Sequence, residues 1–117
     1  MPRDRNEQMQ QCIDNCTQCH NICVETMNQN IEMGDKFGEI AHIRTLQDCA
    51  RMCATSADFM LRDSDLHPKT CGVCAEACER CAESCERLAV GDELMKECAE
   101  MCRTCAKSCH EMARMAA

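Results

Sequence analysis

The sequence is poor in the side chains that build most protein cores. It has no Trp, no Tyr and two Phe, whereas 15 Cys and 10 Met occur among its 117 residues. Ordinary cores are built from large aliphatic and aromatic side chains. A free Cys that is buried as a small hydrophobic residue is usually rare in a domain, so burial alone does not account for this content. The length suits one domain, which we place over residues 1–117.

Other absences exclude classes of partner. The net charge is −7, and the chain lacks the basic stripe that nucleic acids and anionic membranes attract. The opening stretch "MPRDRNEQMQQC" has Arg residues without an apolar run behind them, and no later run is long enough to span a membrane. We therefore expect a cytoplasmic protein with no nucleic-acid or membrane partner. Cytosolic thiols stay reduced, so a Cys-rich pattern there indicates metal binding before disulfides.

Features of enzymes are also absent from the sequence. We find no nucleophile–base pair, no glycine loop that would bind phosphate, and no spaced carboxylates on an apolar stripe. The CxxC pairs could belong to a thiol oxidoreductase, but no βαβ pattern accompanies them. The sequence therefore predicts a protein without catalytic activity.

The cysteines that are present recur at steps of three and four. The run "CGVCAEACERCAESC", residues 71–85, shows the pattern, and four segments share it: residues 4–33, 39–64 and 69–89, and a segment that starts near residue 93. Alternating steps of three and four keep side chains on one face of a helix. The alternation of period two that is typical of strands is missing. Each segment is therefore predicted to be a helix with a stripe of thiols.

Short breaks separate these four segments. "MGDKFG" (residues 33–38) and "VGD" (residues 90–92) each offer Gly where a helix can end and Asp where the next can be capped. Pro68 suits the first turn of a helix. Short connections make successive helices antiparallel neighbours. We predict an all-α, antiparallel up-down-up-down four-helix bundle with a cysteine-lined core, in which the first hairpin overhangs the second by about one to two turns.

Four chemistries compete for the thiols. Disulfides fit poorly, because cysteines three or four apart on a helix have roughly parallel side chains and the number 15 is odd. Zinc knuckles use isolated CxxC pairs, whereas here the pairs continue into CxxxC steps. A ferredoxin run ends in Cys-Pro, which this sequence lacks. Cu(I) accepts two or three thiolates, which one helix and its neighbour can supply, and sharing gives on the order of ten ions per chain.

The two ends of such a bundle differ. Thioether and imidazole groups, weaker soft donors that suit an entry site, gather at one end: Met9, Met60, His67, His110, Met112 and Met115. Mostly aliphatic side chains plug the other end, which has Met27, Ile31, Phe37, Ile40, Ile43, Leu46, Leu88 and Leu94. A Met is more often a core residue than a ligand, and His67 before Pro68 can be a turn residue. His20, in mid-helix beside Cys19, is expected to be a boundary residue, and His42 is expected to be structural.

The stretches "CIDNCTQCHNIC", "CGVCAEACERCAESC" and "CAEMCRTCAKSCH" resemble the bacterial copper storage proteins, in particular the cytosolic kind without an export signal. The resemblance covers residues 9–110 and implies a four-helix bundle that forms a homotetramer and stores many Cu(I) ions in each chain. It implies that the inward thiols are the ligands, with Met or His at the open end. The metal-ligand candidates are Cys12, Cys16, Cys19, Cys23, Cys49, Cys53, Cys71, Cys74, Cys78, Cys81, Cys85, Cys98, Cys102, Cys105 and Cys109, with Met9, Met112, His67 and His110.

The second segment departs from this family pattern. It offers only Cys49 and Cys53, and its Leu46, Ser56 and Met60 positions carry no thiol. The predicted function is cytosolic storage of several Cu(I) ions per chain, with a copper chaperone as a candidate partner. The alternatives are an iron–sulfur electron-transfer protein of ferredoxin type and a zinc buffer of metallothionein type.

Overall fold

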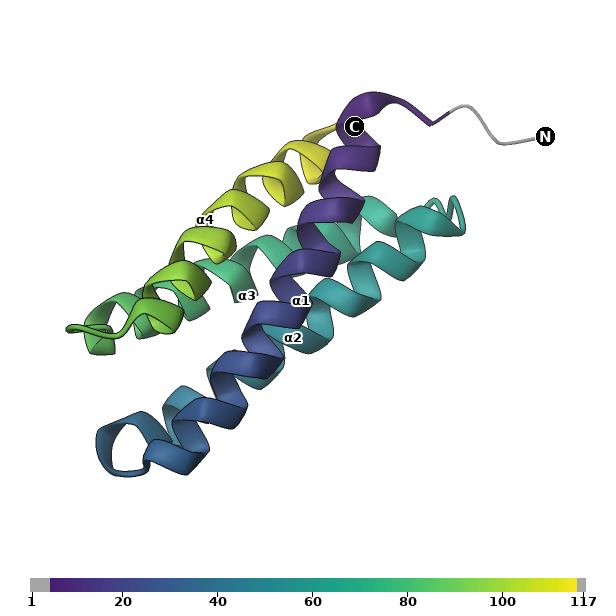
Figure 1. The fold of residues 1–117 in the computed structure, drawn as a ribbon. Helices are drawn as coiled ribbons and strands as arrows, with labels where there is room; N and C mark the ends of the chain where they lie inside the picture. The colour runs from purple at the N-terminus through teal and green to yellow at the C-terminus, as the bar shows by residue number, and fades with distance from the viewer. Residues whose placement is uncertain (1–4, 116–117) are drawn as a thin grey trace.

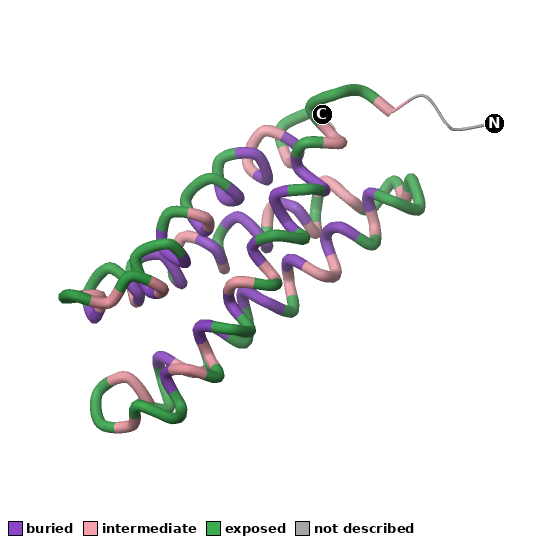
Figure 2. The backbone as a smooth tube through the Cα atoms, in the orientation of Figure 1, coloured by how far each residue is buried: buried purple, intermediate pink, exposed green. Residues whose placement is uncertain are grey.

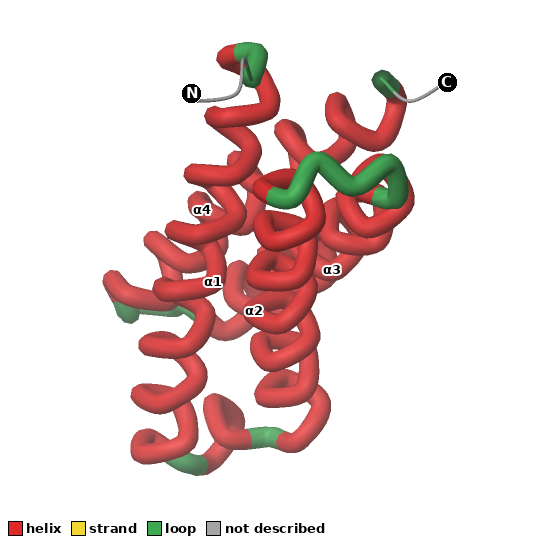
Figure 3. The backbone as a smooth tube through the Cα atoms, turned by 90° about the vertical axis from the view of Figure 1, so that its right-hand side faces the viewer, coloured by secondary structure: helices red, strands yellow, loops and turns green. Residues whose placement is uncertain are grey.

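The computed structural model describes residues 5–115, and within this range the chain is helical apart from short connections (Figures 1 and 3). The predicted start of the first helix at residue 4 lies outside the described residues. Pro68 lies in the first turn of its helix, as predicted. The elements are α1 (Glu7–Met33), the 3₁₀-helix η1 (Asp35–Gly38), α2 (Ile40–Leu61), α3 (His67–Leu88) and α4 (Glu93–Arg114).

The four helices form the predicted antiparallel bundle. Each helix packs against its neighbour in the chain, and α1 closes the ring on α4. Helix α1 has 27 residues whereas the other three have 22 each, and the α1–α2 hairpin extends beyond the α3–α4 connection at the lower left of Figure 1. No helix in the described part of the chain combines the length and hydropathy that a membrane crossing needs.

The connections confirm one predicted cap and correct another. Asp92 caps α4, since its Oδ1 accepts a hydrogen bond of 2.9 Å from the backbone N–H of Met95. Asp35 does not cap α2: it has a φ of 48° and begins η1. Gly34, with a φ of 70°, ends α1, and the chain then makes a 3₁₀ turn before α2 begins. This turn moves the start of α2 to the residue after Glu39, beyond the reach of the Asp35 side chain.

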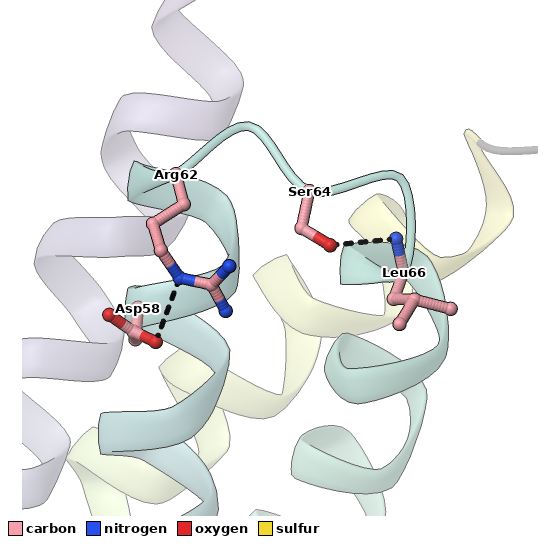
Figure 4. Close-up of polar contacts among 4 residues, drawn as sticks. All are labelled: Asp58, Arg62, Ser64 and Leu66. Atoms are coloured by element: carbon pink, nitrogen blue, oxygen red, sulfur yellow. Dashed lines mark hydrogen bonds and ion pairs between the residues drawn. The ribbon is translucent and has the colours of Figure 1, made fainter.

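The α2–α3 connection is closed by local hydrogen bonds (Figure 4). Asp63 takes a left-handed φ of 58°, and its N–H and that of Ser64 donate to carbonyls in the last turn of α2. The Ser64 hydroxyl accepts a bond of 3.2 Å from the N–H of Leu66. Arg62 and Asp58, one turn apart, form an ion pair of 3.1 Å. These contacts set the tight reversal that brings the start of α3 beside the end of α2.

The core is filled with sulfur. Figure 2 shows the buried positions following the inner face of each helix, and all 15 cysteine side chains are 0% exposed. Small alanines, such as Ala75 and Ala106, separate the thiols on these faces. Large, fully buried side chains lie towards the ends of the bundle, and they include Met60 and Met112 at one end and Leu46 and Met95 towards the other. The middle of the bundle therefore consists of thiols packed between closely spaced helices.

The expected aliphatic plug is only partly correct. Leu46 and Leu88 are buried, but Ile31 and Ile40 are 56% and 67% exposed. Ile31 lies near the end of α1 and Ile40 begins α2, so both belong to the hairpin that extends beyond the α3–α4 connection (Figure 1). Instead, polar side chains that include the fully buried His42 fill this part of the core.

Candidate metal site

Four helical stripes of cysteine meet along the axis of the bundle, and we call these 15 buried side chains the thiol column. Thiols from different helices touch: Cys16 and Cys109 have their sulfurs 3.6 Å apart, and those of Cys49 and Cys78 are 3.7 Å apart. A disulfide bond needs about 2.05 Å, so these sulfurs are in contact but not bonded. All 15 are free thiols.

The thiol column divides into five groups whose sulfurs lie within 4.8 Å of one another. Successive groups share one or two thiols, namely Cys109, Cys105, Cys19 and the pair Cys23 and Cys102, so the column is continuous. Of the predicted cysteines, only Cys85 belongs to none of the five groups. The groups are Cys12, Cys71 and Cys109; Cys16, Cys74, Cys105 and Cys109; Cys19, Cys53, Cys78 and Cys105; Cys19, Cys23, Cys49 and Cys102; and Cys23, Cys81, Cys98 and Cys102.

These spacings match metal–thiolate geometry without movement of the helices. A metal–sulfur distance of about 2.3 Å in a tetrahedral site places sulfurs roughly 3.8 Å apart. Sulfurs in contact between different helices lie 3.6 to 3.9 Å apart. Distance alone therefore suits both Zn(II) and Cu(I). The shared thiols favour Cu(I), because an ion that accepts two or three soft ligands can use bridging sulfurs along a chain of sites.

Hydrogen bonds within the column make neighbouring thiols unequal. Bonds from Cys109 and then Cys12 lower the pKa of Cys71 to about 4, against the opposing effect of burial. Hydrogen bonding with Cys81 and Cys98, together with burial, raises the pKa of Cys85. A sulfur that accepts hydrogen bonds loses its proton more easily, and the donor holds its own proton more tightly. Hydrogen bonding between thiols therefore favours the thiolate form at Cys71 and the neutral thiol at Cys85.

One end of the column, which we call the open end, carries several of the predicted soft donors. Met60 and Met112 are 0% and 1% exposed, and Met9 is partly buried against the core. His67 donates a hydrogen bond of 2.9 Å from Nδ1 to the carbonyl of Ser64, because a carbonyl can only accept. The lone pair of the neutral imidazole is therefore on Nε2, the nitrogen that remains available to a metal ion.

His110 does not face the thiol column. Its Nε2 lies 3.3 Å from a carboxylate oxygen of Glu79, and both side chains are nearly half exposed. It lines a hollow of about 450 Å³ between α3 and α4 together with Arg103 and Lys107. The reason is the helical turn, since the residue after Cys109 points about 100° away from it. Met115 is also turned out, with 54% of its surface exposed.

The opposite end, which we call the closed end, holds a polar network that the sequence analysis missed. His42 Nε2 and Nδ1 each lie 2.6 Å from a partner, Asn30 Oδ1 and Ser84 Oγ respectively. The amide oxygen only accepts, so Nε2 carries the hydrogen and the Ser84 hydroxyl donates to Nδ1. Burial first, and then Arg87, lower the pKa of His42, which keeps the ring neutral. Asn30 continues the α1 stripe seven residues after Cys23, and this periodicity could have revealed it.

The sequence analysis also missed a contact at the open end. Ser56 is fully buried, and its Oγ lies 3.1 Å from the sulfur of Cys71. Its position on the α2 stripe was recognised as lacking a thiol. The contact with Cys71 depends on how α2 and α3 pack, which the sequence alone does not specify. His20, expected to be a boundary residue, is half-buried and contacts Asn21 Oδ1 at 2.9 Å.

An antiparallel helical bundle that encloses a continuous column of reduced thiols defines a protein that binds soft metal ions. The chain belongs to the copper storage protein family, whose model matches residues 5–114. No protein with a curated description matches it.

Solved structures agree with this membership. The protein Nmul_A1745 from Nitrosospira multiformis is 45% identical, with 95% of this chain and 99% of that chain covered and a TM-score of 0.88. The Cu(I)-bound copper storage protein BsCsp3, whose copper-free form is from Bacillus subtilis, is 29% identical, with 92% and 99% covered and a TM-score of 0.84. A cytosolic copper storage protein from Streptomyces lividans with five coppers is 29% identical, with 92% of this chain and 93% of that chain covered and a TM-score of 0.79. A Streptomyces lividans copper storage protein has also been loaded with 10 copper equivalents.

Proposed function

We propose that this protein stores Cu(I), holding many ions at once inside each four-helix bundle. The observation that carries the proposal is the continuity of the thiol column, in which five groups of fully buried thiols are joined by shared members. A site built for one structural ion would need only four converging ligands. A column of bridging thiolates suits a soft monovalent ion taken up in quantity.

The proposed storage ligands are all 15 cysteines. Fourteen of them lie in the five groups, and Cys85 is the exception. Cys85 lies one helical turn from Cys81, and a pair of thiols at that spacing is enough for two-coordinate Cu(I). With two ligands per ion and sharing along the column, the capacity is on the order of ten Cu(I) per chain. The Streptomyces lividans relative loaded with 10 copper equivalents supports this figure.

We further propose that Met9, Met112, His67 and His110 bind Cu(I) in transit at the open end. Met112 and His67 are best placed for this role, since Met112 lies against the core and Nε2 of His67 carries the lone pair. His110 has to leave Glu79 before it can reach a copper ion. Its contribution is therefore expected to be smaller than that of Met112.

The setting of the protein follows from the same membership. We propose that residues 1–117 form one domain that stores copper and has no catalytic activity. We place it in the cytoplasm, because the Streptomyces lividans relative is described as cytosolic. We also propose a homotetramer, for which exposed apolar side chains such as Ile31, Ile40 and Val24 provide surface to cover. Because the bound Cu(I) is deeply buried, we expect a copper chaperone to deliver or remove it at the open end.

Anaerobic titration of the reduced, metal-free protein with Cu(I) tests the storage function. We expect tight binding of on the order of ten or more ions per chain. The absorbance of thiolate-to-copper charge transfer reports saturation in an ultraviolet window that the absence of Trp and Tyr leaves clear. Visible colour with bound iron in the purified protein would instead indicate an iron–sulfur protein. Saturation at one to three Cu(I) per chain would contradict storage.

A further inference from the structure

The outermost thiol group differs from the other four. This mouth group contains three thiols, Cys12, Cys71 and Cys109, whereas each of the others contains four. Its members are the first cysteines of α1 and α3 and the last of α4, which meet at the open end. Where the stripe of α2 reaches this layer, it presents Ser56, fully buried and 3.1 Å from the sulfur of Cys71. A hydroxyl thus stands where the fourth helix would supply a fourth thiol.

A group of three thiols suits some metal ions better than others, because metal ions differ in the number of ligands that they require. Zn(II) in thiolate sites is almost always held by four Cys or His ligands, and a neutral hydroxyl is not among its usual partners. Cu(I) is satisfied by two or three soft sulfurs. The buried side chains nearest to the open end beyond the mouth group include the thioethers of Met60 and Met112, which suit Cu(I). Among the described residues, no His, Asp or Glu joins the three thiols of the mouth group, and His67 lies outside it. Within this group, therefore, Cu(I) finds a complete set of ligands and Zn(II) lacks a fourth.

We propose that Ser56 is a specificity-determining residue that admits Cu(I) to the column and slows the entry of Zn(II). The proposal rests on the storage function, because it assigns selectivity to the same column. The selection acts on entry, since the deeper groups have four thiols each and would hold Zn(II) once it had passed. Ser56 also orients Cys71: when that sulfur is a metal-bound thiolate, only the hydroxyl carries a hydrogen, so Ser56 donates.

The test is uptake of Zn(II) by the reduced, metal-free chain, followed anaerobically with a zinc-sensing chelator dye. Ser56→Cys should complete the mouth group and take up Zn(II) at least tenfold faster than wild type, with one more ion bound rapidly per chain. Ser108→Cys is the matched control. Ser108 is also a buried serine at this end, but it accepts a bond of 3.1 Å from Asn15 on the α1–α4 side. It should behave as wild type.

Two further arms keep the proposal open to refutation. Ser56→Ala leaves three thiols at the mouth, so it should still take up Zn(II) as slowly as wild type. Prior exposure of the wild-type chain to Zn(II) should leave its initial rate of Cu(I) loading within twofold. The proposal is overturned if Ser56→Cys matches wild type, if Ser108→Cys accelerates equally, or if Zn(II) slows wild-type Cu(I) loading tenfold. Saturation of the wild type at a few Cu(I) ions would refute storage itself, whatever these variants do.

Discussion

Cysteine has two roles in this bundle, because the same side chain fills the core and ligates the cargo. Burying a thiol contributes less than burying Leu or Ile, so the metal-free core is held by weaker contacts than those of an aliphatic bundle. Alanines such as Ala75 and Ala99, between the thiols, let the helices approach closely enough for sulfurs on different helices to touch. Each cysteine thus combines core packing with metal ligation. The larger buried side chains lie towards the ends of the bundle.

His42 gives the clearest prediction at the scale of one residue. Burial lowers its pKa below the usual value near 6.5, so the unfolded chain takes up a proton at a higher pH than the folded one. This contribution to stability is fully present above the unfolded pKa and is lost as the pH falls through the depressed folded value. His42→Leu should remove that pH dependence. It should also cost about 2 kcal/mol at pH ~7.5, because the buried partners Asn30 and Ser84 lose a hydrogen bond.

Urea unfolding of the reduced, metal-free protein at about pH 7.5 and 5.5, followed by far-ultraviolet circular dichroism, measures this effect. The thiols contribute equally to wild type and variant, so the difference between the two isolates His42. His20→Leu is the control, because His20 contacts only its neighbour Asn21 among the polar groups described, and this variant should keep the wild-type pH dependence. If His42→Leu also keeps it, His42 is not the titrating group.

At the scale of the helix, α3 shows how a single stripe can be devoted to one function. It carries five thiols, and the first large apolar side chain on its inner face is Leu88, at its last residue. Its place in the bundle therefore depends on its contacts with α2 and α4, which pack against it. Removing thiols from α3 should change what the bundle binds more than how it folds.

Replacing both Cys78 and Cys81 with Ser tests this expectation. The volume changes little, so the helical content should stay the same. The Cu(I) capacity should fall by on the order of two ions, because each thiol belongs to a four-thiol group. Cys85→Ser is the comparison within the same helix, and its loss should be smaller, because Cys85 lies in none of the groups. Anaerobic Cu(I) titration gives the capacities, and an unchanged capacity in the double variant would show that these thiols are not ligands.

The helices and their inner faces could be predicted from the sequence because the steps of three and four between cysteines are a local property. The ends of the helices were less certain, since Asp35 was expected to cap α2 and instead begins η1. The inward direction of each stripe predicts that sulfurs of different helices meet, but it does not predict which pairs are in contact. Contacts such as Ser56 with Cys71 depend on the axial offset between helices, which the lengths of the connections constrain only loosely.

Residues at the edge of a stripe were the hardest to place. His110 follows a column cysteine directly, yet it pairs with Glu79 on the outside. Asn30 was not considered as a core residue, although it is fully buried and bonds His42. In both cases the outcome depends on a partner on another helix, and a single sequence does not reveal that partner. The burial and partners of polar residues near a stripe therefore could not be predicted from the sequence alone.

At the scale of the whole molecule, the bundle is a tube with unlike ends. The open end carries Met60, Met112 and the three-thiol mouth group, which are all soft donors. The closed end carries His42 of α2, which is hydrogen-bonded to Asn30 of α1 and Ser84 of α3. Both ring nitrogens of His42 are engaged in hydrogen bonds, and the amide and hydroxyl oxygens beside them are hard donors. This network therefore offers Cu(I) no path of soft ligands. Copper should therefore enter and leave at the open end, and the deep thiols should set how much is held.

Two methionines, one towards each end, allow this direction to be tested by the same change, Met to Leu, at each position. Met112, at the open end, and Met95, towards the closed end, are 1% and 0% exposed, so replacing either with Leu keeps the size and apolar character and removes only a thioether. We expect Met112→Leu to slow loading, and removal by a small chelator, several-fold while the capacity stays the same. Met95→Leu should change neither. Stopped-flow absorbance gives the rates and titration the capacities. Loss of capacity without a change of rate would make Met112 a storage ligand, and equal effects of the two variants would mean that the tube has no preferred end.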